Sequence, residues 1–258
     1  MCRLAAYLGP EIHLGRFILE PEHNLQVQAW GPREMEEARM NADGFGFGWY
    51  RNGQPGKYVN TCPMWSDINL DSLCGSLSSG ACLANVRSAT PGQAVSLDNT
   101  QPFISDRFMY LHNGFIKQFG EKVKSNFHAS LSPAVQAGIQ GNTDSEYLFA
   151  LFRQELAAAG SDPVEALGGL LAALPSLLDG ATALVNLVIC DGHRLLACRR
   201  AFNNGNCPSL YFTDRHPDFP DAVLIASERL SMPDAWEAVG ENSTLLIARG
   251  KPVEYPAL

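Results

Sequence analysis

Residues 182–199 read TALVNLVICDGHRLLACR, and this stretch decides the fold. Two apolar runs, Thr182–Cys190 and His193–Arg199, are separated by Asp191–Gly192. That dipeptide between two apolar runs is typical of a two-residue β-hairpin turn. We therefore expect an antiparallel pair of strands in this part of the chain.

Two helices are expected immediately before the hairpin. Asp144–Ala159 carries apolar residues at helical spacing and acidic residues at its start, where negative charge is favoured. Its apolar face consists of Leu148, Leu151, Phe152 and Leu156. A second helix is expected over Pro163–Leu178, after the breaker Gly160–Asp162.

Strand-like runs occupy much of the remaining chain. They are Cys2–Leu8, Gly44–Tyr50, Ala81–Val86, Pro102–Ser105, Arg107–Leu111, Leu210–Phe212, Ala222–Ser227 and Ser243–Ala248. The reversal signals in Arg51–Gly56 predict that 44–50 pairs with 57–60, and Asp67–Leu77 suits a short amphipathic helix. Strands, then two long helices, then strands again predict an α/β (α+β) fold in which antiparallel sheets pack against helices in about four layers.

Composition and charge restrict the classes of partner. The 258 residues are 46% hydrophobic and 18% charged, which is ordinary for a soluble globular protein. The net charge of -8 argues against nucleic acid and anionic membrane surfaces, because both repel an acidic protein. Residues 1–20 lack the pattern of a secretory signal, and no stretch approaches a membrane span. We expect a cytoplasmic protein with one domain over residues 2–258 and a small-molecule ligand.

The seven cysteines match neither a disulfide framework nor a thiolate zinc site, because their number is odd and no two form a close CxxC pair. Six of them are expected to be buried packing residues in a reducing compartment. The six histidines are scattered without helical ligand spacing. We therefore expect no metal and no other cofactor.

The remaining cysteine, Cys2, directly follows the initiator Met1. Removal of Met1 would leave one residue with both a thiol and an α-amine, and such an amine can take the thiol's proton near neutral pH. Cys2 is therefore a candidate nucleophile with its own base. The alternative is a small apolar residue that opens the strand Cys2–Leu8.

Five segments occur in an order and spacing that resemble the class II glutamine amidotransferase domain. They are Cys2 after Met1, Asn41–Trp49 (NADGFGFGW), Val86–Thr90 (VRSAT), His112–Gly114 (HNG) and Asn142–Glu146 (NTDSE). The resemblance covers nearly the whole chain, including the late segment Ile225–Glu228. It implies an N-terminal nucleophile hydrolase with a four-layer α/β/β/α sandwich.

The resemblance also implies roles for the residues of these segments. Cys2 would attack a γ-glutamyl amide to form a thioester, and the Asn113 side chain with the Gly114 N–H would hold the oxyanion. Arg87 suits the substrate α-carboxylate, because guanidinium and carboxylate form two parallel hydrogen bonds. Asp144 would bind the α-ammonium. Thr90 and His112 complete the expected substrate-binding set.

Each assignment has a structural alternative. Arg87 could be a surface cation at a strand end, and Asn113–Gly114 could be a tight turn. Asp144 and Ser145 could cap the helix that begins there. The glycines at 44, 46 and 48 lack the following lysine of a phosphate loop, so nucleotide binding is not expected.

The short chain and Pro91, where large synthetic members have histidine, favour a hydrolase without an attached synthase domain. It resembles the branch that cleaves γ-glutamyl-hercynylcysteine sulfoxide in the ergothioneine pathway. Alternatives are a glutaminase subunit that supplies a separate synthase, degradation of glutathione or γ-glutamylcysteine with a partner subunit, and a catalytically silent binding protein. A homo-oligomer is a further alternative.

The sequence does not place the contacts to the leaving group. Candidates are the aromatic residues Phe45, Phe47, Trp49 and Phe115 and the loop Phe202–Pro208. An aromatic face could hold a trimethylammonium group, although aromatics near glycines more often belong to a core. Thr213–Pro220 is a second expected loop at the mouth of a site.

Overall fold

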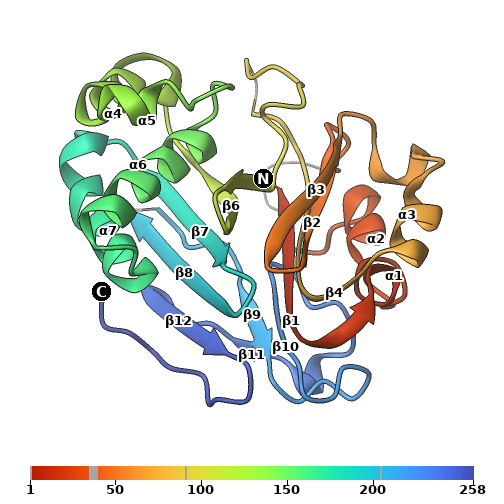
Figure 1. Cartoon of the computed structure of the whole chain (residues 1–258). Coiled ribbons are helices and arrows are strands. Elements are labelled where there is room, and N and C mark those ends of the chain that lie inside the picture. Colours follow the sequence, from red (N-terminus) through yellow and green to blue (C-terminus); the bar gives the residue numbers. More distant parts are fainter. Residues whose placement is uncertain (1, 35–39, 91, 204) are drawn as a thin grey trace.

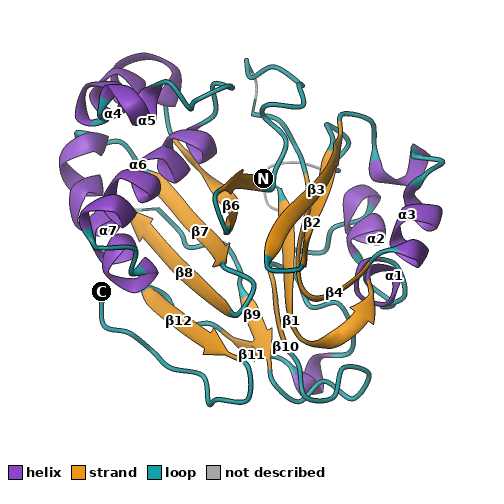
Figure 2. Ribbon diagram, in the orientation of Figure 1, coloured by secondary structure: helices purple, strands orange, loops and turns teal. Residues whose placement is uncertain are grey.

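The computed structural model describes residues 2–34, 40–90, 92–203 and 205–258. Two antiparallel β-sheets stack face to face, and helices cover the outer face of each (Figure 2). This is the expected four-layer α/β/β/α sandwich. The Met1 of the expected processing step lies outside the described residues.

The first sheet has seven strands in the order β11-β9-β10-β1-β4-β2-β3. Their bounds are β1 (Arg3–His13), β2 (Phe45–Arg51), β3 (Gln54–Asn60), β4 (Ser78–Val86), β9 (Tyr211–Thr213), β10 (Val223–Ala226) and β11 (Glu237–Ala238). The central strand β1 pairs Ala5 with Ala84 of β4 on one side and with Ala226 of β10 on the other. The strand that follows Cys2 is therefore fixed from both sides.

The second sheet has five strands in the order β12-β8-β7-β6-β5. Their bounds are β5 (Phe103–Ser105), β6 (Phe108–Ile116), β7 (Ala183–Cys190), β8 (Arg194–Phe202) and β12 (Ser243–Ala248). The expected β7–β8 hairpin forms, with Gly192 at a positive φ of 87°, but its turn is one residue later than expected. Cys190 pairs with Leu195, and the Asp191 N–H donates to the Arg194 carbonyl, so the two central turn residues are Gly192 and His193. The expected β2–β3 hairpin is also present and turns at Asn52–Gly53.

The helices divide into two outer layers (Figure 1). The first sheet is covered by α1 (Leu14–Ile18), α2 (Leu25–Trp30) and α3 (Leu70–Ser76), and the second by α4 (Lys124–Ser130), α5 (Pro133–Gln136), α6 (Asp144–Ala158) and α7 (Pro163–Leu178). Short 3₁₀ helices lie at Met64–Ser66 and Pro233–Ala235, and a π-helical turn at Phe119–Val123. Within the described ranges, no helix has the length and apolarity needed to cross a membrane.

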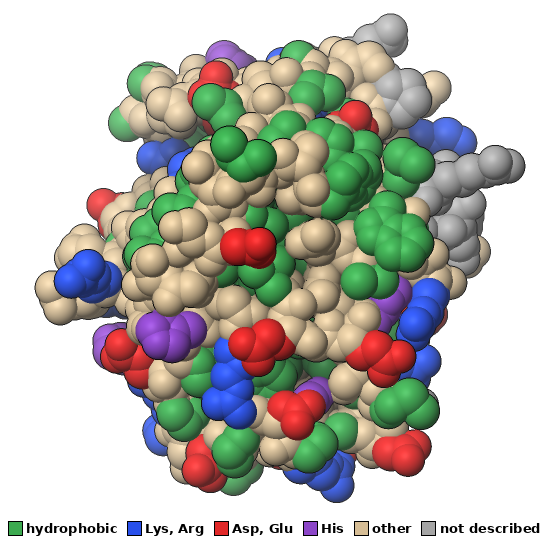
Figure 3. Space-filling view, turned by 90° about the vertical axis from the view of Figure 1, so that its right-hand side faces the viewer, with side chains coloured by type: hydrophobic (Ala, Val, Ile, Leu, Met, Phe, Trp, Pro, Cys, Tyr) green, Lys and Arg blue, Asp and Glu red, His purple; other side chains and the backbone are tan. Residues whose placement is uncertain are grey.

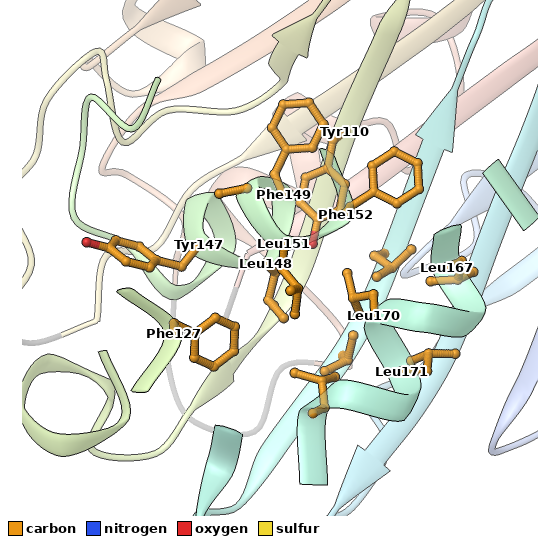
Figure 4. Close-up of a cluster of buried hydrophobic side chains, with 14 of the residues drawn as sticks. Tyr110, Phe127, Tyr147, Leu148, Phe149, Leu151, Phe152, Leu167, Leu170 and Leu171 are labelled. Carbon is orange, nitrogen blue, oxygen red and sulfur yellow. The ribbon is translucent and has the colours of Figure 1, made fainter. Parts of the chain in front are cut away.

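An aromatic cluster attaches α6 to the second sheet (Figure 4). The Tyr110 ring of β6 stacks on Phe149 with centroids 5.0 Å apart, and Phe149 stacks in turn on Phe152. Both phenylalanines are buried, and burial of one such side chain stabilises the fold by about 1.5–3 kcal/mol. This packing fixes α6, and with it the position of Asp144 at its first turn.

Glycines allow the two sheets to approach closely at β2. A Cβ at Gly46 would collide with the Gln101 carbonyl oxygen, and one at Gly48 with the Met109 sulfur. The alternating residues Phe45 and Phe47 face the other way, into the core beneath α1–α3. The glycine-rich pattern therefore serves sheet packing.

The outer face around α1–α3 carries a hydrophobic area (Figure 3). Large apolar side chains stay exposed there, including Trp30 at 59% and Ile68 at 93%. Both belong to this helical layer or to the segment leading into α3. They contribute little to the core.

Candidate active site

A cavity of about 990 Å³ opens at the end of the sandwich where β1 begins. Six of the seven expected site residues line it: Cys2, Arg87, Thr90, His112, Gly114 and Asp144. Figure 1 shows the start of β1 beside the end of β6, so the two sheets bring these distant segments together. Most of the expected site residues therefore line one cavity.

Cys2 stands directly before β1, and its side chain is half-buried. Residues alternate between the two faces of a strand, and Leu4 and Ala6 belong to the core between the sheets. Cys2 shares their face. Its Sγ lies 3.8 Å from the Ser88 carbonyl oxygen, in the segment that also carries Arg87.

Asp43 holds that segment in place. Its Oδ2 accepts a hydrogen bond of 2.8 Å from the Ala89 N–H, and its own N–H donates to the Arg87 carbonyl at 3.0 Å. Sequence reasoning found the Asn41–Trp49 motif but gave Asp43 no role. The available sequence signal for Asp43 was its position directly before a glycine. Glycine can adopt a positive φ, which is 113° at Gly44.

The Arg87 guanidinium is buried rather than a surface cation, with 3% exposure. Its Nη2 donates to the Ala94 carbonyl at 3.0 Å, which orients the side chain. Burial lowers the pKa of Arg87, and the nearby carboxylates of Asp43 and Asp144 oppose that shift. An arginine stays charged under these conditions, so the cavity holds a desolvated cation close to Cys2.

Asp144 is also buried, at the first position of α6. Its Oδ2 accepts from the Ile116 N–H at 2.7 Å, and its Oδ1 from the Ser145 N–H at 2.8 Å. The cap of α6 is Thr143, whose hydroxyl accepts from the Glu146 N–H at 3.2 Å. The alternative in which Asp144 and Ser145 cap the helix is therefore wrong.

Both ring nitrogens of His112 have protein partners. Nε2 lies 3.1 Å from the Leu184 carbonyl, which can only accept, so Nε2 carries the hydrogen and Nδ1 accepts from the Ser145 hydroxyl at 2.8 Å. Burial lowers the pKa of His112, against the opposing effects of Asp144 and the Leu184 carbonyl. A neutral ring fits this pattern. The geometry favours His112 as support for Ser145, and its contact with substrate stays a prediction.

Asn113 and Gly114 lie within β6, so they are not a turn. Asn113 is fully buried and does not line the cavity, although both its neighbours do. Neither atom of its amide has a hydrogen-bond partner among the described residues. Gly114 has no space for a Cβ, which would collide with the Leu184 carbonyl.

The loop before β9 forms part of the cavity wall, as expected for Phe202–Pro208, of which Asn204 lies outside the described residues. Arg199 holds this loop by donating to the carbonyls of Cys207 at 3.1 Å and Pro208 at 2.7 Å. Asn186 donates to the carbonyls of Pro208 and Ser209 at 3.1 and 3.0 Å. Sequence reasoning missed both residues, because nothing in the strand pattern around them indicates hydrogen bonds to a loop 8 to 23 residues further along the chain.

Two expectations about side chains need correction. Of the aromatic candidates, Phe115 lines the cavity, but Phe45 and Phe47 are fully buried in the helix-side core and Trp49 packs on Phe47. Four of the six packing cysteines are buried: Cys74, Cys82, Cys190 and Cys198. Cys62 and Cys207 are half-buried instead, and Cys207 lines the cavity.

Among the described residues, no group of three or more His, Cys, Asp or Glu is arranged to hold a metal ion.

Two antiparallel sheets lie between helical layers, and a cysteine at the start of a central strand shares one cavity with a buried arginine and a buried aspartate. Residues 20–248 match the family model of the class II glutamine amidotransferases. The chain belongs to this family and is an amidohydrolase.

Three proteins illustrate the similarity. A gamma-glutamyl-hercynylcysteine sulfoxide hydrolase of Mycobacterium tuberculosis (strain CDC 1551 / Oshkosh) is 31% identical, over 100% of this chain and 97% of its own. The probable glutamine amidotransferase DUG3 of Saccharomyces cerevisiae is 27% identical, over 100% of this chain and 85% of its own. The solved structure of a glutamine aminotransferase class-II domain protein from Silicibacter pomeroyi has a TM-score of 0.72 at 26% identity and covers 98% of both chains.

Proposed function

We propose that this amidohydrolase cleaves a γ-glutamyl amide through a thioester on Cys2 and releases glutamate. The observation that carries the proposal is the shared cavity of Cys2, Arg87 and Asp144. A γ-glutamyl group has a carboxylate and an ammonium at its head and an amide at the far end. A buried cation and a buried anion beside a thiol match those three groups in chemical type.

In the proposed reaction, the Cys2 sulfur attacks the amide carbonyl, and the terminal amine takes the thiol proton and passes it to the leaving nitrogen. The C–N bond breaks as the thioester forms, and water then releases glutamate. The Asn113 amide would donate to the oxyanion together with the Gly114 N–H. In the part of the chain that the structure describes, that amide has no other hydrogen-bond partner, which supports this role.

For the leaving group we propose a substituent larger than ammonia, with γ-glutamyl-hercynylcysteine sulfoxide as the substrate. The relatives named as hydrolases of that compound cover nearly the whole chain. A cavity of about 990 Å³ is also large for a free glutamine, since complete drug-sized ligands occupy pockets of about 300–1,000 Å³. Phe115 and the loop before β9 are the candidate contacts to the substituent.

We propose that residues 2–258 form one catalytic domain, because β1 near the start of the chain pairs with β10 at residues 223–226. A glutaminase subunit that supplies a separate synthase remains the second candidate, favoured by the relative named as a probable glutamine amidotransferase. Degradation of glutathione or γ-glutamylcysteine, a silent binding protein, a partner subunit and a homo-oligomer stay alternatives that assays must separate.

The test is glutamate release from glutamine, γ-glutamylcysteine, glutathione and γ-glutamyl-hercynylcysteine sulfoxide. Wild-type protein is expected to prefer the last of these, and Cys2→Ala to lose nearly all turnover because it removes the nucleophile. Cys62→Ala is the matched control, since Cys62 is also half-buried but lies outside the cavity lining. Full activity of Cys2→Ala, or no release from any substrate, would disprove the proposal. Glutamine turnover that rises with an added partner would favour the second candidate.

A further inference from the structure

Glu228 is a buried carboxylate to which the proposed reaction assigns no step. It follows β10 closely and is 1% exposed. Four nitrogen atoms, from three separate parts of the chain, converge on its two oxygens. A side chain with so many partners determines where those segments lie relative to one another.

Two of these nitrogens belong to the backbone of Arg33 and Glu34. The Arg33 N–H donates to Oε2 at 2.9 Å, and the Glu34 N–H to Oε1 at 3.0 Å. Both residues line the cavity. Because a backbone N–H has a fixed direction, Glu228 sets the position of this part of the wall.

Residues 33 and 34, which form this part of the cavity wall, lie beside the loop before β9, which is a candidate contact to the leaving group. The Glu34 carboxylate accepts a hydrogen bond of 2.8 Å from the hydroxyl of Tyr211, the first residue of β9. The loop immediately before β9 supplies Cys207, Pro208 and Ser209 to the same cavity. Residues 33–34 and the loop thus meet at one end of the site.

The third nitrogen belongs to Arg3, the residue after Cys2. Its Nη1 lies 3.3 Å from Oε1 of Glu228, and both side chains are almost fully buried. Among the described residues, none of the Arg3 guanidinium nitrogens has a conventional hydrogen bond. Burial lowers the pKa of Arg3, and the Glu228 carboxylate opposes this most strongly. Glu228 is therefore the charge that compensates Arg3.

The fourth is Nε2 of His23, at 2.8 Å from Oε2. His23 is itself fixed, because its N–H donates to the Leu230 carbonyl at 2.9 Å and its carbonyl accepts from the Gln28 amide at 2.8 Å. These bonds anchor the carboxylate to α2. The anchor gives Glu228 a defined position from which to hold the other two segments.

We propose that Glu228 is a positioning residue for γ-glutamyl amide hydrolysis, holding the strand of Cys2 through Arg3 and the leaving-group wall through Arg33 and Glu34. This inference rests on the proposed function. The two connections predict two separable effects. Movement of Cys2 would lower kcat for every substrate, whereas movement of residues 33–34 would raise KM only for substrates with a large leaving group.

The test uses Glu228→Gln, which keeps the shape but replaces one acceptor oxygen by an NH2 donor and removes the charge. We expect kcat to fall by about 100-fold on all substrates, the effect expected of small misplacements in an active site. We also expect KM to rise for γ-glutamyl-hercynylcysteine sulfoxide relative to the smallest γ-glutamyl amide that the wild type turns over. A merely structural role would reduce the amount of folded enzyme, lowering apparent kcat equally and leaving both KM values unchanged.

Asp191→Asn is the matched control. Asp191 is a buried carboxylate that accepts from two backbone N–H groups and pairs with Arg194, but it lies at the β7–β8 turn, outside the cavity lining. If Glu228→Gln folds poorly, Arg3→Met/Glu228→Gln removes both charges and should keep the KM effect. If the wild type is active and the Glu228 variants behave like Asp191→Asn, the positioning role is disproved and the proposed function is unaffected. An inactive wild type would instead remove the proposed function.

Discussion

The buried amide of Asn113 has no hydrogen-bond partner among the described residues, and the proposed reaction would give it one. A buried amide without partners costs about 1–3 kcal/mol of stability, which a bound oxyanion would offset for its N–H group. Only the folded structure shows that this amide is buried without a partner among the described residues. From sequence, Asn113–Gly114 is equally compatible with a turn.

We predict that Asn113→Ala lowers kcat by about 100- to 1,000-fold, the usual effect of losing one oxyanion donor. The same change should leave the free energy of unfolding nearly unchanged or raised, because the alanine leaves no unsatisfied group. Steady-state kinetics and urea denaturation of one preparation measure both quantities. A large loss of stability with unaltered kcat would show that the amide serves the fold.

His112 gives a pH prediction. Burial holds its folded-state pKa below the ordinary value, so below about pH 6.5 the unfolded chain binds more protons and stability falls as the pH drops toward the folded-state pKa. His112→Gln should therefore lose less stability than wild type between pH 7.5 and 5.5 in urea titrations. Burial also lowers the pKa of His216, but this histidine is present in wild type and variant and lowers the stability of both. The difference between their stability losses therefore reports on His112 alone. Parallel losses would contradict the assignment.

At the scale of elements, prediction succeeds where the pattern is complete within a short stretch of chain. The α6 and α7 helices and the β7–β8 hairpin have their apolar spacing and turn residues in sequence, and all three form, with the hairpin turn one residue later than expected. The helices α1 and α2 were missed. They are 5 and 6 residues long, so their stability comes from packing on the first sheet rather than from a local pattern.

The same distinction applies to the site. The motifs predicted Cys2, Arg87 and Asp144 as members of one site, because each lies in a recognisable local segment. Sequence could not assign Asp43, Gln101 or Glu228, because the hydrogen-bond partners of these side chains lie outside their own local segments. Gln101, for example, pairs with the backbone of His112 through both atoms of its amide.

The first turn of α6 allows a comparison between two helix caps. Thr143→Ala should cost about 1 kcal/mol of stability and also raise KM, because the cap adjoins the carboxylate proposed to bind the α-ammonium. Asp162→Ala removes the cap of α7, which accepts from the N–H groups of Val164 and Glu165. It should cost similar stability with KM unchanged. Equal KM effects from the two variants would show that the cap of α6 does not act on substrate binding.

For the molecule as a whole, the spacing between the sheets depends on β2. Gly46 lies against backbone and Gly48 against the end of a flexible methionine side chain. Gly46→Ala should therefore cost at least the upper part of the about 1–3 kcal/mol typical of overpacking, and Gly48→Ala less, because Met109 can move. Denaturation midpoints of the two variants provide the measurement. An equal or reversed order would mean that the sheets are not in rigid contact there.

The pairing of β1 with β10 also has a consequence during protein synthesis. The ribosome makes β1, the strand that follows Cys2, more than 200 residues before Val223–Ala226, which is one of the two strands that pair with it. Contacts between such distant parts of a chain close late in folding. The strand that carries the proposed nucleophile should thus stay incompletely paired until residues 223–226 have been translated, and the proposed hydrolytic activity should appear only after that point.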